Sequence, residues 1–135
     1  MLDVRKQISI FLANRPGTLA DVCEELDDQN INILAMTVSD TVDHAVVRML
    51  VDKPGEAVHR LEDQGLLVVE NDVLTVDLKN RPGALAGMAR DLADNGINIE
   101  YAYCTASPAQ QKGMMIIRMS DPEEARELLE SDIEG

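Results

Sequence analysis

The most constraining feature of the sequence is a segment that occurs twice. Residues 14–33 read NRPGTLADVCEELDDQNINI and residues 80–99 read NRPGALAGMARDLADNGINI, so that 11 of the 20 aligned positions carry the same residue. The second copy begins 66 positions after the first. A fixed period of this length indicates that one structural unit has been built twice. We therefore expect two units within the 135 residues, 1–71 and 72–135.

Apolar periodicity predicts the elements of the first unit. Residues 8–13 alternate as a strand does, and an apolar stripe at every third or fourth position predicts a helix that Pro16 opens and Asn30 ends. The rest of the unit predicts strands over 31–38 and 45–51, a helix from Pro54 to Gly65 and a strand over 66–70. The order is βαββαβ.

The second unit repeats this order up to its last helix. Its expected elements are a strand over 73–78, a helix over 82–95, strands over 97–104 and 114–119, and a helix over 122–130, with a longer loop over 105–113. No residues follow that suit a fourth strand. Because Asn71-Asp72 suits a tight hairpin, we expect strand 66–70 to pair with the first strands of both units in one seven-stranded sheet.

These patterns predict the fold class. It is α+β: two tandem ferredoxin-like βαββαβ modules, the second lacking its last strand, with antiparallel sheets and the helices on one face.

Composition excludes several classes of function. The net charge of −13 opposes binding to nucleic acid or to an anionic membrane. Cys23 and Cys104 lie far apart and lack the spacing of metal ligands, and no apolar run has the length of a signal sequence or membrane span. We expect a cytoplasmic protein without a disulfide, metal or cofactor.

The first strand-to-helix junction carries the candidate chemistry. The first amides of a helix lack internal partners and attract a carboxylate. Asn14 offers amide donors and an acceptor, Gly17 lets a ligand approach the main chain, and Asn32 opens the next strand with a second amide. A ligand with an ammonium and a carboxylate on one carbon needs this mixture. The junction therefore predicts a site for a free amino acid.

The two motifs resemble the signature of the ACT domain, a regulatory module of amino-acid metabolism. They read Asn14-Arg15-Pro16-Gly17-Thr18-Leu19 with Asn30-Ile31-Asn32-Ile33, and Asn80-Arg81-Pro82-Gly83-Ala84-Leu85 with Gly96-Ile97-Asn98-Ile99. The resemblance is nearest to the serine-binding ACT domain of phosphoglycerate dehydrogenase, in which the loop Asn and the strand Asn contact serine from two facing domains. It implies that the ligand is bound by Asn14, Arg15, Pro16, Gly17, Thr18, Leu19 and Asn32, and by Asn80, Arg81, Pro82, Gly83, Ala84, Leu85 and Asn98. The histidine that this family places two residues before the loop Asn is replaced by Leu12 and Leu78.

Structural roles for the same residues stay open at this point. Asn14 and Asn80 also suit a turn that is closed by local hydrogen bonds, and Gly17 and Gly83 also suit close packing of a helix on a strand. Alternation directs Asn32 and its repeat Asn98 away from the helices, toward the other sheet face or an interface.

The favoured function is therefore a non-catalytic regulatory protein that binds a free amino acid. No nucleophile–base pair or pair of acids accompanies the repeated loops, which argues against an enzyme. We expect a homodimer, because the outer sheet face carries Phe11, Leu34, Met36 and Val38. The alternative is a regulatory subunit that contacts a biosynthetic enzyme such as acetolactate synthase, with ligand binding secondary.

Overall fold

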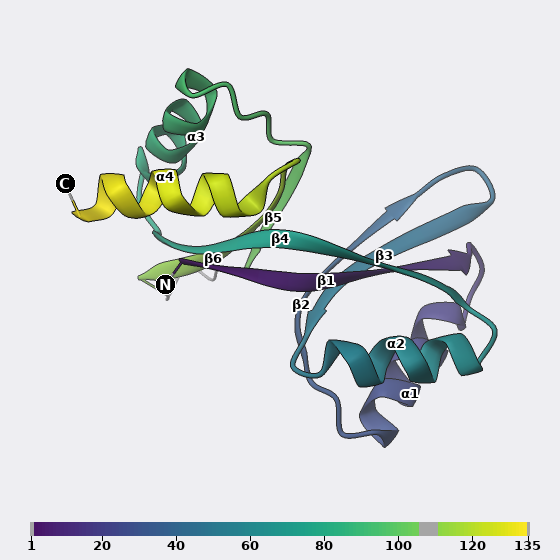
Figure 1. Ribbon diagram of the computed structural model, residues 1–135. Helices are drawn as coiled ribbons and strands as arrows, with labels where there is room; N and C mark the ends of the chain where they lie inside the picture. The colour runs from purple at the N-terminus through teal and green to yellow at the C-terminus, as the bar shows by residue number, and fades with distance from the viewer. Residues whose placement is uncertain (1, 106–110, 135) are drawn as a thin grey trace. The chain divides into compact units, whose positions relative to one another are not determined.

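The computed structural model describes residues 2–105 and 111–134 (Figure 1). Its elements are β1 (Leu2–Ala13), α1 (Thr18–Asp28), β2 (Ile33–Asp40), β3 (His44–Val51), α2 (Pro54–Asp63), β4 (Leu67–Lys79), α3 (Ala84–Asp94), β5 (Tyr101–Thr105), β6 (Lys112–Arg118) and α4 (Pro122–Glu134). Most of the expected loop over 105–113 lies outside the described residues. None of the described helices has the length and apolarity needed to cross a membrane.

The chain forms two compact units that both contain parts of β1 and β4. Lys6–Asn71 makes up the first, called the N-unit, and Met1–Arg5 together with Asp72–Gly135 makes up the second, called the C-unit. The strands follow the order β2-β3-β1-β4-β6-β5. Each unit thus has four strands, β2-β3-β1-β4 in the N-unit and β1-β4-β6-β5 in the C-unit. The expected α+β architecture of tandem ferredoxin-like modules is confirmed.

The prediction of a hairpin at Asn71-Asp72, and with it a seventh strand, is wrong. Residues 67–70 and 73–78 belong to one continuous strand, β4. A tight hairpin turn requires positive φ angles, and Asn30 is the one described non-glycine residue with such an angle. Apolar side chains at even-numbered positions on both sides of Asn71-Asp72 pack on a core, which favours an extended path. Leu66 and Val68 pack on the N-unit core, and Leu74 and Val76 belong to the C-unit core.

The start of β1 supplies the strand that the second repeat lacks. Leu2 and Val4 pack against the C-unit core, and the Thr75 hydroxyl on β4 donates a hydrogen bond to the Asp3 carbonyl at 3.3 Å. In the strand order of the C-unit, residues 2–5 therefore occupy the edge position that a fourth strand takes in the plait.

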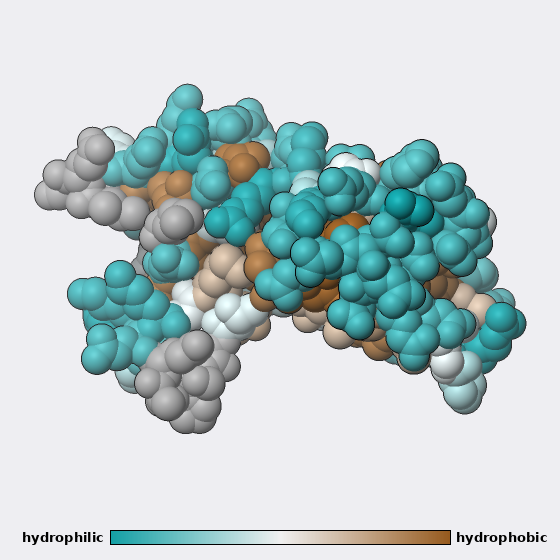
Figure 2. Space-filling model, turned by 90° about the horizontal axis from the view of Figure 1, so that it is seen from below, coloured by the Kyte–Doolittle hydropathy of each residue, from teal (hydrophilic) through white to brown (hydrophobic). Residues whose placement is uncertain are grey.

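In the N-unit, α1 and α2 cover one face of the sheet. Their buried residues share a core with apolar residues of β1 and β3: Ile8, Ile10, Leu12, Val22, Leu26, Ile31, Val47, Met49, Val51, Ala57 and Leu61. Figure 2, which views the molecule from the side of α1 and α2, shows mainly hydrophilic residues over these helices. The acidic arc of α1 contributes to that surface, since Glu24, Asp27 and Asp28 are exposed.

In the C-unit, α3 and α4 cover the sheet in the same way. The core contains Leu74, Val76, Met88, Leu92, Met115, Ile117, Met119, Ala125 and Leu129. It contains no aromatic side chain and three methionines, in keeping with the two tyrosines and one phenylalanine of the whole sequence. Flexible thioethers fill such an aliphatic core.

Pairing between β2 and β3 shifts by one residue between Ile33 and Ala35. Beyond this shift Met36 lies opposite Met49 and Val38 opposite Val47, and both partners belong to the helix-facing core. Directly opposed residues point to the same side of a sheet, and a one-residue shift exchanges the faces. The prediction that Met36 and Val38 lie on the outer face is therefore wrong. They stay 41% and 47% exposed because β2 is an edge strand.

Candidate ligand-binding site

Both strand-to-helix loops adopt the same backbone turn. In the N-unit the Arg15 amide donates to the Ala13 carbonyl at 3.0 Å, and in the C-unit the Arg81 amide donates to the Lys79 carbonyl at 2.9 Å. The Thr18 hydroxyl reinforces the first loop by donating to the carbonyls of Ala13 and Arg15, at 2.9 and 3.1 Å. Ala84 replaces this threonine in the second loop.

Gly17 and Gly83 end the two loops in the left-handed region, with φ angles of +94° and +92°. A β-carbon at either position would meet no atom within 4 Å. Glycine is therefore required by the backbone conformation. It is not required by close packing of the helix on a strand, because there is room for a side chain. The helices begin directly afterwards, at Thr18 and Ala84, so the prediction that Pro16 opens the first helix is wrong. Pro54 does open α2 as expected.

The first turn of each loop helix is free of a side-chain cap. The N-cap residues Gly17 and Gly83 have no side chain that could accept a hydrogen bond from the first amides of α1 and α3. Uncapped amides at a helix N-terminus attract an anion. Within the described residues the Asn14 side chain makes no hydrogen bond. The alternative that Asn14 closes a turn through local hydrogen bonds of its side chain is therefore not supported.

The strand asparagines lie far from the loops of their own units. The backbone amide of Asn14 donates a hydrogen bond to the Asp43 carbonyl just before β3, at 3.5 Å. The backbone amide of Asn32 instead donates to the Asp52 carboxylate just after β3, at 2.9 Å. The full length of β3 separates the two residues. Asn80 and Asn98 are placed in the same way, since the Asn80 amide donates to the Gln111 carbonyl before β6 and Asn98 precedes β5.

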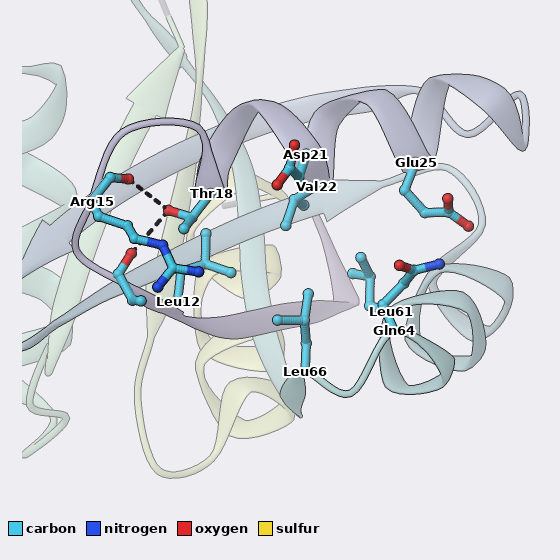
Figure 3. A pocket seen from close by; sticks show the side chains of 10 residues that line it. Leu12, Arg15, Thr18, Asp21, Val22, Glu25, Leu61, Gln64 and Leu66 are labelled. Carbon is cyan, nitrogen blue, oxygen red and sulfur yellow. Dashed lines mark hydrogen bonds between the residues drawn. The ribbon is translucent and has the colours of Figure 1, made fainter.

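A cavity of about 270 Å³ opens beside the N-unit loop, between α1 and α2 (Figure 3). We call it the N-groove. Its lining is Leu12, Ala13, Arg15, Thr18, Asp21, Val22, Glu25, Leu61, Gln64 and Leu66. Leucine and valine side chains form its floor, while Arg15 lies at the loop end and Asp21 and Glu25 follow along α1. The cavity thus combines an apolar floor with both signs of charge.

Sequence reasoning identified two polar residues of this cavity, Arg15 and Thr18, and missed three others. Asp21, Glu25 and Gln64 were not among the predicted site residues. The available signal was the position of Asp21 and Glu25 on either side of the buried Val22, one turn apart. That spacing puts two carboxylates beside the loop cation.

The C-unit loop lines a separate cavity of about 300 Å³ between α3, β5 and β6. The residues of the loop motif that contribute to it are Asn80, Arg81, Pro82 and Leu85, of which Leu85 is 50% exposed. Lys79 also lines it, and Lys79 lies directly opposite Lys112 in the pairing of β4 with β6. The described residues of both units contain no group of three histidine, cysteine or acidic side chains that could hold a metal ion.

A family model described as "ACT domain pair" matches residues 3–133. The chain belongs to this family. Comparison with curated proteins finds no significant match. The resemblance to the serine-binding domain of phosphoglycerate dehydrogenase is not confirmed by the comparisons.

Three solved structures illustrate the likeness of this ACT domain pair. Protein BT0572 from Bacteroides thetaiotaomicron is 34% identical, with a TM-score of 0.90 over 97% of this chain and 90% of that one. The regulatory subunit of aspartate kinase from Thermus thermophilus is 21% identical, with a TM-score of 0.72 over 96% of each chain. A structure of aspartokinase alpha and beta subunits is 17% identical, with a TM-score of 0.67 over 99% of this chain and 97% of that one. At these lower identities the last two establish the shared fold.

Proposed function

We propose that this ACT domain pair is a non-catalytic regulatory protein that binds a free amino acid at its strand-to-helix loops. The observation that carries the proposal is the repeated loop conformation. Both copies hold a left-handed glycine with open space around it before an uncapped helix. The helix start offers donors to a carboxylate, and the Asn14 and Asn80 amides offer both donors and an acceptor.

The strand asparagines join this site through a second copy of the chain. Because β3 separates Asn14 from Asn32 within one unit, a single ligand contacts both types of residue only where two units face each other. The exposed edge strand β2, which Asn32 precedes, supports a homodimer as that arrangement.

A thermal-shift screen of the twenty amino acids tests the proposal. A ligand present at about 100 times its dissociation constant stabilises the native state by roughly 2.7 kcal/mol, which raises the melting temperature by several degrees. Acetate is the control for an anion effect. If no amino acid at millimolar concentration raises the melting temperature more than acetate does, the proposed sensing role is wrong.

A second candidate function is regulation through contact with an amino-acid biosynthetic enzyme. It is supported by the match to a chain named as a regulatory subunit of aspartate kinase, which has the same extent and fold as this one. Affinity purification of the tagged protein from its native cells, with and without added amino acids, tests this function. Recovery of a stoichiometric biosynthetic enzyme without any thermal shift would favour the subunit over the sensor.

A further inference from the structure

The N-groove holds opposite charges that do not neutralise each other. Within the described part of the chain, the side chains of Arg15, Asp21, Glu25 and Gln64 make no hydrogen bond or ion pair with one another or with other groups. Figure 3 shows the Arg15 guanidinium at one end of the cavity and the carboxylates of Asp21 and Glu25 along its α1 wall. A ligand with charges of both signs is thus complementary to these groups.

The repeat provides an internal comparison for this cavity. A groove of about 290 Å³ between α3 and α4, here called the C-groove, is lined by residues one repeat period later, including Leu78, Arg81, Ala84, Met88 and Asp91. The lining of the N-groove carries one base and two acids. The lining of the C-groove adds Asp77 and Lys79 and carries two bases and two acids.

Two polar residues of the N-groove have no polar counterpart in the C-groove. The position of Asp21 is taken by Gly87 in the second repeat, and that of Thr18 by Ala84. The N-groove therefore has a net charge of −1 from its lining, whereas the C-groove is neutral. Only the N-groove places two carboxylates one helical turn apart, opposite a guanidinium.

We infer that the N-groove is a binding site for an α-amino acid whose side chain carries a second positive charge. The ligand carboxylate pairs with Arg15, its two cationic groups lie against Asp21 and Glu25, and its methylene groups cover the apolar floor. This ligand neutralises the groove, and the acidic surface of the protein attracts it. The cavity of about 270 Å³ has room for one molecule of amino-acid size. The inference rests on the proposed function and names the class of amino acid that it concerns, because Arg15 and Thr18 of the strand-to-helix loop also line the groove.

Calorimetry with L-lysine and L-norleucine tests the inference, since norleucine has the same carbon chain without the side-chain ammonium. Loss of a hydrogen bond to a charged group corresponds to about tenfold in affinity, so we expect L-lysine to bind about tenfold more tightly. The double variant Asp21→Asn, Glu25→Gln should remove this preference while leaving the melting temperature unchanged. Asp91→Asn in the C-groove is the matched control and should preserve it.

Amide chemical shifts locate the bound ligand. L-lysine should shift the amides of α1 and α2 residues that line the N-groove and leave those of α3 and α4 unchanged. The inference is overturned if lysine and norleucine bind equally, if the double variant keeps the preference, or if the shifts occur in the C-unit.

Discussion

The Thr75 hydroxyl and the Asp3 carbonyl are joined by a hydrogen bond of 3.3 Å across 72 residues of sequence. This bond lies inside the C-unit and ties the first residues of the chain to β4. Leu2 and Val4, on either side of Asp3, extend the core that α3 and α4 cover. The start of the chain is therefore a structural part of the second repeat.

The first prediction concerns that dependence. A fragment of residues 72–135 should be poorly folded, because β4 would lose its neighbour and expose an apolar edge. Adding residues 2–5 to the end of the fragment through a flexible linker should restore cooperative unfolding, as measured by circular dichroism during a thermal melt. A cooperative transition of the unmodified fragment would contradict the assigned role of residues 2–5.

The second prediction uses two glycines that lie four residues apart. Gly83→Ala should destabilise the protein by about 1–2 kcal/mol, because its φ of +92° is unfavourable for a residue with a β-carbon. Gly87→Ala lies inside α3 with no atom within 4 Å of an added β-carbon, so it should stabilise the protein by about 0.8–1 kcal/mol. Urea unfolding of both variants checks the opposite signs. Equal effects would mean that the loop conformation does not require glycine.

Local patterns predicted the helices and strands because each depends on residues close in sequence. Asn30 was expected to end the first helix, and its φ of +58° is the left-handed conformation typical of that position; its repeat Gly96 has a φ of +74°. Non-local features were not predictable in the same way. Asn71-Asp72 has the composition of a turn, but its path is set by β1 and β6 on either side of β4. The register shift near Leu34 likewise depends on pairing with β3.

The loop residues of the candidate site could be predicted from the sequence, whereas the helix residues that line the cavity could not. The repeated motif identified Arg15 and Thr18, whose positions follow from the turn itself. Glu25 lies in α1 and Gln64 directly follows α2, so the two meet at the N-groove only through packing of α1 beside α2. Hydropathy assigns such residues to solvent, because a polar cavity wall and a solvated helix face have the same composition.

The third prediction concerns the loop asparagines. Asn14→Ala and Asn80→Ala should each weaken binding at their own loop by roughly tenfold to a hundredfold, since hydrogen bonds to charged groups contribute about 1.5–3 kcal/mol. The Asn14 side chain is exposed, so the melting temperature of Asn14→Ala without ligand should stay unchanged. Calorimetry of the single variants shows which loop is occupied. Full affinity in both variants would remove these residues from the site.

The fourth prediction concerns the edge strand β2 and the proposed homodimer. Leu34, Met36 and Val38 are 39%, 41% and 47% exposed, and β2 has a strand neighbour on one side only. An apolar edge of this kind is suited to pairing with a second copy. Sedimentation of the unmodified protein at micromolar concentration should give the mass of a dimer. Val38→Lys should shift the equilibrium toward monomer, because two copies would bring like charges together.

Val42→Lys is the matched control for this variant. Val42 is 95% exposed and lies in the turn after β2. Val42→Lys therefore makes the same change of side chain outside the strand. The control should sediment as the unmodified protein does. A dimer that survives Val38→Lys, or dissociates equally with Val42→Lys, would place the interface elsewhere. Since Asn32 precedes the same strand, a true β2 interface also predicts that Val38→Lys weakens amino-acid binding at the loops, whereas Val42→Lys leaves it intact.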